Sequence, residues 1–147
     1  MRKVLLAAAA MLCITAAHAQ AIGEVNTAFK LFGPDHKIVV DAFDDPKVQG
    51  ATCYLSRSKA GGIAGALGVA DEKSEASIAC RQTGPLKVLG TLPQNEIAFG
   101  EDRSFLFKKL KVVRMFDAQR QVLVYLAYSD KLIDGSPKNS ISVIPLR

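Results

Sequence analysis

Short apolar runs separated by turn-forming residues dominate the chain from Lys37 onward, and this pattern most limits the folds it can adopt. The runs are rich in β-branched and aromatic residues, Gly, Pro, Asp and Asn stand between them, and sustained helical periodicity is scarce. We expect strands at residues 38–43, 52–57, 77–82, 105–116, 121–128 and 140–144, and shorter strands at 86–89 and 96–99. The pattern predicts an all-β or mainly β fold, an antiparallel sandwich or barrel-like domain.

Two local signals define the strand ends most clearly. Residues 105–116 and 121–128 are joined by the turn Asp117-Ala118-Gln119-Arg120, which predicts a long hairpin. The strand at 38–43 should end at Asp44-Asp45-Pro46, because proline has no amide hydrogen to continue a ladder. Residues 21–32 fit either a short leading strand or a turn of helix.

The first nineteen residues have the form of a cleavable export signal. A positive pair, Arg2 and Lys3, precedes an apolar run, and Ala17-His18-Ala19 supplies the small residues that signal peptidase accepts. The alternative is an uncleaved membrane anchor, but the run is shorter than the roughly 20 residues needed to span a bilayer. We therefore predict cleavage between Ala19 and Gln20, a periplasmic destination, and a mature form without a membrane anchor.

The mature chain, residues 20–147, has the length of one domain. The signal removes two of the nineteen Lys and Arg, so the net charge becomes 17 minus 14, or +3. This small excess does not indicate a nucleic-acid partner. The basic residues of 108–114 alternate with Leu110, Val112 and Val113, which is typical of a solvated strand face, the alternative being a stripe for an anionic ligand.

Cysteine spacing predicts one structural disulfide. Once Cys13 leaves with the signal, only Cys53 and Cys80 remain, an even pair in an oxidising compartment. A bridge closing a loop of about 28 residues stabilises the fold by roughly 3 to 4 kcal/mol on the chain-entropy model. The alternative, a redox-active dithiol, usually needs the closer C-x-x-C spacing.

A glycine-rich stretch lies between the two cysteines. It lacks the Gly-Lys-Ser/Thr of a phosphate-binding loop and the strand-helix context of a dinucleotide site. We interpret it as a loop whose apolar members pack on the core or form a contact patch. The candidate binding residues are Gly61, Gly62, Ile63, Leu67 and Val69.

One histidine and several carboxylates form the alternative candidate site. His36 is the sole histidine left after export, and it stands close to Asp35, Asp41 and Asp44. A zinc site with two histidines is excluded, and no spaced calcium-binding loop is present, so we expect neither metal nor cofactor. The alternative is a turn with solvated charges, which explains the same residues without a catalytic or metal-binding role.

Several segments together resemble one known family. The quoted motifs are Ile22-Gly23-Glu24-Val25, residues 33–40, Ala42-Phe43-Asp44-Asp45-Pro46, Thr52-Cys53-Tyr54, Ser56-Arg57, Gly61-Gly62-Ile63, residues 125–131 and Gly135-Ser136-Pro137-Lys138-Asn139. In these the chain resembles the CreA family of Gram-negative bacteria. The resemblance implies a periplasmic protein linked to envelope or catabolite-response physiology, with no activity, cofactor or catalytic residue to carry over.

The sequence therefore favours a non-enzymatic periplasmic module that binds an envelope protein or a small ligand. Its support is a disulfide-bridged β scaffold bearing an apolar loop. The alternative is a small periplasmic hydrolase using His36 with Asp35, Asp41 or Asp44, which requires His36 to lie in a cleft.

Overall fold

Eight strands and no helix make up the described part of the chain. The computed structural model describes residues 19–28, 31, 36–59, 76–104, 108–131 and 138–147. The strands, in chain order, are β1 (Gln20–Ala28), β2 (His36–Asp44), β3 (Val48–Lys59), β4 (Ala76–Val88), β5 (Glu96–Ser104), β6 (Lys108–Asp117), β7 (Val122–Lys131) and β8 (Asn139–Pro145). Within these ranges, no helix is long and apolar enough to cross a membrane.

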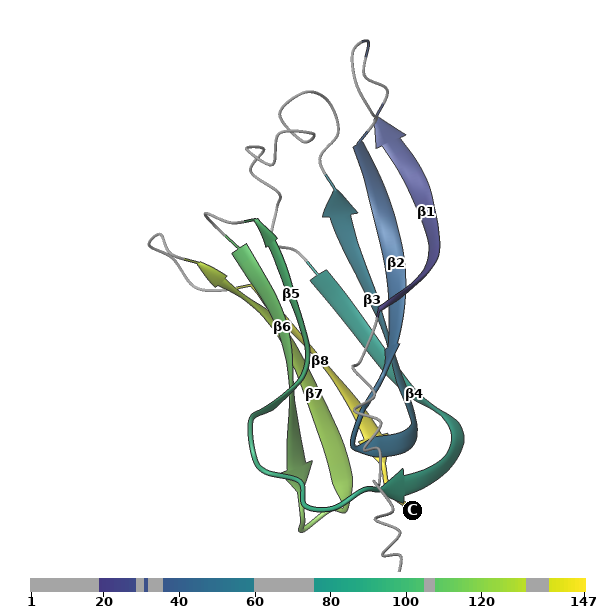
Figure 1. Cartoon of the computed structure of the whole chain (residues 1–147), viewed down its shortest axis with the longest axis vertical. Helices are drawn as coiled ribbons and strands as arrows, with labels where there is room; N and C mark the ends of the chain where they lie inside the picture. Colours follow the sequence, from purple (N-terminus) through teal and green to yellow (C-terminus); the bar gives the residue numbers. More distant parts are fainter. Residues whose placement is uncertain (1–18, 29–30, 32–35, 60–75, 105–107, 132–137) are drawn as a thin grey trace, which may run out of the picture.

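The strands form two antiparallel sheets of four, each a simple meander. Sheet A has the order β1-β2-β3-β4, and sheet B has the order β5-β6-β7-β8. The two sheets face each other across an apolar interior (Figure 1). The predicted all-β antiparallel fold is confirmed, and so is the hairpin of β6 and β7, whose strands meet at Asp117 and Val122.

Several sequence-based strand boundaries differ from the structure: β3 and β5, for example, are longer than expected. Residues 21–32, for which the sequence fitted either a strand or a turn of helix, include most of strand β1, which ends at Ala28. Strand β2 begins at His36, two residues earlier than expected. The two separate runs at 77–82 and 86–89 belong mainly to one strand, β4. Periodicity could not join them because a bulge interrupts the alternation.

The bulge in β4 lies opposite Gly50. Gln49 pairs with Lys87 and Ala51 with Gln82, so one residue of β3 faces four of β4. Pro85 lies within the bulge, where a missing amide hydrogen breaks no ladder bond. Gly50 has φ = +80°, and a Cβ there would lie 2.5 Å from the carbonyl oxygen of Pro85. Only glycine fits this crossing without displacing the backbone.

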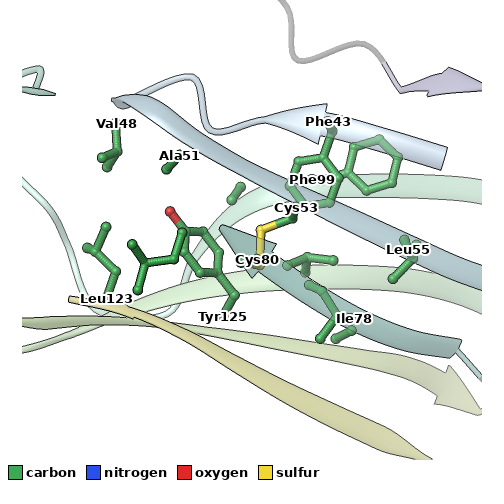
Figure 2. Close-up of a cluster of buried hydrophobic side chains, with 14 residues drawn as sticks. Phe43, Val48, Ala51, Cys53, Leu55, Ile78, Cys80, Phe99, Leu123 and Tyr125 are labelled. Carbon is green, nitrogen blue, oxygen red and sulfur yellow. A yellow bond between two sulfur atoms is a disulfide. The ribbon is translucent and has the colours of Figure 1, made fainter. Parts of the chain in front are cut away.

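The core fills the space between the sheets, and the disulfide lies inside it. Cys53 and Cys80 are directly opposed on β3 and β4, are joined by a bond of 2.05 Å, and are both buried (Figure 2). Phe43 of β2 stacks on Phe99 of β5 with ring centroids 4.6 Å apart, which connects the two sheets. The predicted bridge is confirmed, and it joins neighbouring strands.

Side-chain hydroxyls connect sheet A to sheet B along β4 and β8. The amide of Ile78 donates to Ser140 Oγ at 3.1 Å, and Ser140 Oγ donates to the carbonyl of Ala76 at 3.1 Å. The amide of Cys80 donates to Ser142 Oγ at 2.8 Å. Serines on β8 therefore satisfy backbone groups that β4 presents away from β3, and they hold this side of the sandwich together.

We expect Gly50→Ala to lower the free energy of unfolding by about 2 to 4 kcal/mol, since the new Cβ adds both left-handed strain and overlap. Urea denaturation of the oxidised protein measures the change. Gly90→Ala is the matched control, because Gly90 has φ = +82° but no atom within 4 Å of its Cβ position. This control should cost only about 1 kcal/mol. Equal costs for both variants would mean that the close approach at the bulge is unimportant.

Candidate functional site

The structure keeps the candidate catalytic residues of β2 apart. His36 begins the strand and Asp44 ends it, so about 26 Å of extended chain separates them. Asp41 points to the opposite face from His36, because side chains alternate along a strand. Asp35 lies outside the described residues. The described part of β2 therefore does not bring His36 together with Asp41 or Asp44.

Both of these aspartates hold other residues in place. Asp41 Oδ2 accepts hydrogen bonds from Arg57 Nε at 3.1 Å and Nη2 at 2.6 Å, and both side chains are buried. Asp44 Oδ1 accepts a hydrogen bond from Thr52 Oγ1 at 2.6 Å, and Thr52 Oγ1 lies 2.6 Å from Thr83 Oγ1. These contacts connect β2 to β3 and β3 to β4.

The glycine-rich candidate site lies outside the described residues. This holds for all five of its members, Gly61, Gly62, Ile63, Leu67 and Val69. The described strands show only where this segment is attached: β3 ends at Lys59 and β4 begins at Ala76, at one end of sheet A. The binding role of this segment stays a prediction.

The solvated-face interpretation of the basic run is wrong for Arg114. Its side chain is 1% exposed and lies on the core face of β6 with Val112. Lys111 points to the outer face, where its Nζ lies 6.0 Å from the centre of the Tyr128 ring. The sequence itself indicates that Arg114 points inward, because two-residue alternation places it on the same face as Leu110 and Val112.

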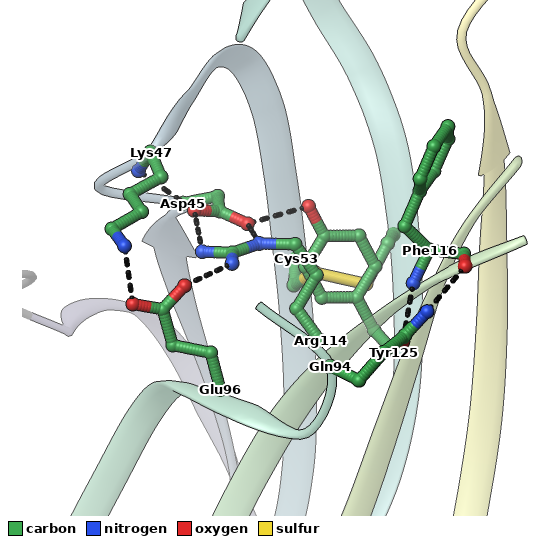
Figure 3. Close-up of polar contacts among 9 residues, drawn as sticks. Asp45, Lys47, Cys53, Gln94, Glu96, Arg114, Phe116 and Tyr125 are labelled. Atoms are coloured by element: carbon green, nitrogen blue, oxygen red, sulfur yellow. Dashed lines mark hydrogen bonds and ion pairs between the residues drawn. A yellow bond between two sulfur atoms is a disulfide. The ribbon is translucent and has the colours of Figure 1, made fainter. Parts of the chain in front are cut away.

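Arg114 belongs to a buried polar cluster that the sequence analysis missed. Its centre is the carboxylate of Asp45, which accepts hydrogen bonds from Arg114 Nε at 2.6 Å, Arg114 Nη2 at 2.8 Å and the Tyr125 hydroxyl at 2.7 Å (Figure 3). The backbone amide of Lys47 also donates to Asp45, at 2.8 Å. Glu96 completes the cluster by accepting from Arg114 Nη1 at 2.7 Å and pairing with the ammonium of Lys47.

Hydrogen bonding controls the ionisation of this cluster. Burial alone would raise the pKa of Asp45, but hydrogen bonds from Arg114, the Lys47 amide and Tyr125 outweigh burial and lower it. The pKa of Glu96 is lowered by hydrogen bonds from Lys47 and Arg114. Burial, and then the charge of Asp45, raise the pKa of Tyr125. At neutral pH a charged Arg114 therefore faces two carboxylates while the tyrosine stays neutral.

The cluster is suited to holding the sheets together. It joins the turn after β2 to β5, β6 and β7, and its donors and acceptors bond mainly to one another. Among the described residues, the one buried side-chain polar atom without a hydrogen-bond partner is Ser129 Oγ, which lies outside this cluster. The described residues also contain no group of three metal-ligating side chains.

The outer face of sheet B is the strongest candidate for a functional surface. The strand register places two apolar rows across it. One row is Ile97, Val113, Leu126 and Ile141, and the other is Met115, Val124 and Val143. Ile97 is 55% exposed, Ile141 63% and Val143 51%, whereas Val113, at the centre of the first row, is only 5% exposed. This surface, which we call the apolar face, is of the kind that proteins use to bind partners.

The outer face of sheet A has a different character. Hydroxyl side chains dominate its β3 and β4 positions, namely Thr52, Tyr54, Ser56, Ser58, Ser77 and Thr83. An open hollow of about 220 Å³ lies at one end, lined by Ile38, Ser56, Arg57, Ser58, Ala76 and Ser77. Sheet A also exposes large apolar side chains, among them Val25 at 66% and Ile38 at 40%, but an apolar row that crosses all four strands is described only on sheet B.

We expect Arg114→Met and Asp45→Asn each to lower the free energy of unfolding by about 3 to 5 kcal/mol, because each leaves a buried charge without its partner. The double variant should cost about 2 kcal/mol less than the sum of the two, since neither charge remains. Urea denaturation completes the cycle. Arg120→Met is the matched control, because Arg120 pairs with Asp117 but is 70% exposed, and it should cost less than about 1 kcal/mol. Additive costs in the cycle would contradict a coupled ion pair.

The same cluster should make the fold sensitive to acid. Because the pKa of Asp45 and that of Glu96 are lowered in the folded state, the unfolded chain takes up protons first as the pH falls. Their contribution to stability is thus complete above the ordinary carboxyl pKa of about 4 and is lost as the pH drops below it. Urea denaturation at a series of pH values should show that the free energy of unfolding falls less steeply with decreasing pH in Asp45→Asn than in the wild type. The same pH dependence in both proteins would show that Asp45 is not responsible.

Comparison with known proteins agrees with the resemblance found in the motifs. The sequence model of the CreA protein family matches residues 22–147. Protein CreA of Escherichia coli strain K12 is 54% identical over 134 residues, which cover 88% of this chain and 85% of that protein. Protein CreA of the O6:H1 and O157:H7 strains gives the same values. No solved structure gives a significant match. The chain belongs to the CreA family.

Proposed function

We propose that this chain is exported to the periplasm and acts there as a non-enzymatic module that binds a protein partner through the apolar face. Export is supported by the signal pattern of the first nineteen residues. The proposed cleavage after Ala19 leaves strand β1 complete, because that strand begins at Gln20. A buried Cys53–Cys80 disulfide also suits an oxidising compartment.

The observation that carries the binding role is the composition of the apolar face. One apolar row crosses all four strands of sheet B and the other crosses three, and three of their side chains are more than half exposed. The core is already complete on the other side of the same strands, through Val112, Leu123 and Tyr125. The outer rows are thus not needed to fill the sandwich, and a bound partner would remove their exposed side chains from water.

The described acidic residues of sheet A favour a structural role over a catalytic one. Asp41 is bound by Arg57, Asp44 by Thr52, and Asp45 by Arg114 and Tyr125. Nothing in the described ranges supports the hydrolase alternative based on His36. The binding role of the glycine-rich segment and the link to envelope or catabolite-response physiology stay predictions.

The proposal is tested by photo-crosslinking in living cells. The full chain, carrying a photo-reactive phenylalanine analogue at Ile141 or Val143, is expressed in a Gram-negative host and irradiated. We expect a processed chain beginning at Gln20 in the periplasmic fraction, and adducts of higher mass from both positions. Tyr54 is the matched control, since it is 37% exposed on the outer face of sheet A.

Three results would contradict the proposal. An unprocessed chain in the cytoplasm would overturn export. Irradiation without adducts from Ile141 or Val143 would overturn binding through the apolar face. Adducts from Tyr54 alone would move the contact surface to sheet A.

A further inference from the structure

We propose that the partner bound by the apolar face is a second copy of this chain, packed face to face about a two-fold axis that crosses β6. This inference rests on the proposed function, because it names the occupant of the same surface. In the dimer, β6 of one copy lies antiparallel to β6 of the other. Each strand of sheet B then faces its own counterpart.

The order of residues along β6 is the first argument. Alternate side chains share a face, so Lys111, Val113, Met115 and Asp117 all lie on the outer face, where Val113 is 5% exposed and the other three are partly exposed. The series reads cation, apolar, apolar, anion, with the charges about 20 Å apart. A two-fold axis at the level of Arg114 inverts this order and places Lys111 of each copy opposite Asp117 of the other. The face is thus complementary to itself in charge.

The two apolar rows satisfy the same symmetry. One row crosses the sheet at the level of Val113 and the other at the level of Met115, one on each side of the proposed axis. Rotation therefore packs the Val113 row of one copy on the Met115 row of the other. The exposed ends of these rows on β8, Ile141 and Val143, would be covered by β8 of the second copy, whereas Ile97, the exposed end on β5, has no counterpart in the Met115 row.

The size of the face suits such a partner. Strands of seven to ten residues, four abreast, present a face on the order of 600 Å². Two such faces bury about 1,200 Å², the lower end of the range for specific interfaces. Face-to-face sheets pack about 10 Å apart, which side chains of this size fill. We therefore expect a reversible dimer whose dissociation constant is micromolar.

The charged contacts lie at the margin and set the orientation. Lys111 Nζ is positioned over the Tyr128 ring, and Asp117 Oδ2 accepts a hydrogen bond from Arg120 Nη1 at 3.0 Å. Neither group is fully buried. Marginal charges of this kind select the register of an interface more than they strengthen it. The apolar rows supply the affinity.

Sedimentation equilibrium of the mature, oxidised protein from about 1 to 200 µM tests the proposal. We expect a monomer–dimer equilibrium that Val143→Asp weakens at least tenfold. Val25→Asp is the matched control, because Val25 is 66% exposed on the outer face of sheet A, and it should leave the equilibrium unchanged. Circular dichroism and thermal unfolding confirm that each variant is folded.

A charge swap tests the orientation. Lys111→Glu and Asp117→Lys should each weaken the dimer several-fold, because each creates two like-charge contacts across the axis. The double variant should restore the affinity of the wild type, although Asp117→Lys also removes the contact with Arg120. Rescue in the double variant cannot arise from a folding defect. Failure of rescue would overturn the proposed axis.

Other outcomes separate this inference from the proposed function. If the chain stays monomeric throughout the concentration range, the proposed dimer is wrong. If Val143 then crosslinks to a different protein in cells, the second copy is the wrong partner and the binding role stands. If Val143 gives no adduct at all, both proposals fail.

Discussion

The buried contact between Arg114 and Asp45 is the interaction on which the arrangement of the two sheets most depends. It connects the turn after β2 in sheet A to β6 in sheet B, and Tyr125 and Glu96 extend it to β7 and β5. A guanidinium that is 1% exposed is stabilised only if each of its charged neighbours is correctly placed. The relative position of the sheets is thereby specified at this end, where apolar packing alone would allow sliding.

This polar contact works together with two others that differ in kind. The stacked rings of Phe43 and Phe99 join the sheets through apolar area, and the hydroxyls of Ser140 and Ser142 join β8 to the backbone of β4. The disulfide acts within sheet A only, since Cys53 and Cys80 are neighbours across one ladder. Because the side chains of the inner faces are already packed in this way, the outer faces are available for binding, and that of sheet B carries aligned apolar rows.

Much of the fold follows from local pattern, and the exceptions have identifiable causes. The runs of β-branched residues and the turn at 117–120 were sufficient to predict β6, β7 and their hairpin, because these are contacts between neighbours in sequence. The prediction divided β4 into two strands because a bulge interrupts its alternation, and this bulge forms opposite Gly50 of β3. The candidate site was predicted less well. The basic run was read as one solvated face although alternation placed Arg114 inward, and the apolar residues of the outer face are scattered over four strands.

By itself the sequence determined the all-β character, the approximate strands and the pairing of Cys53 with Cys80, because alternation, turn residues and an even cysteine count are local or countable properties. Only the tertiary structure decided which polar residues are buried together and which apolar residues share an exposed face. Asp45 lies 69 residues from Arg114 and 80 from Tyr125. Ion pairs and surfaces of this kind depend on strand register and on the stacking of sheets. Those are set by the packing of the whole chain, and no window of neighbouring residues contains them.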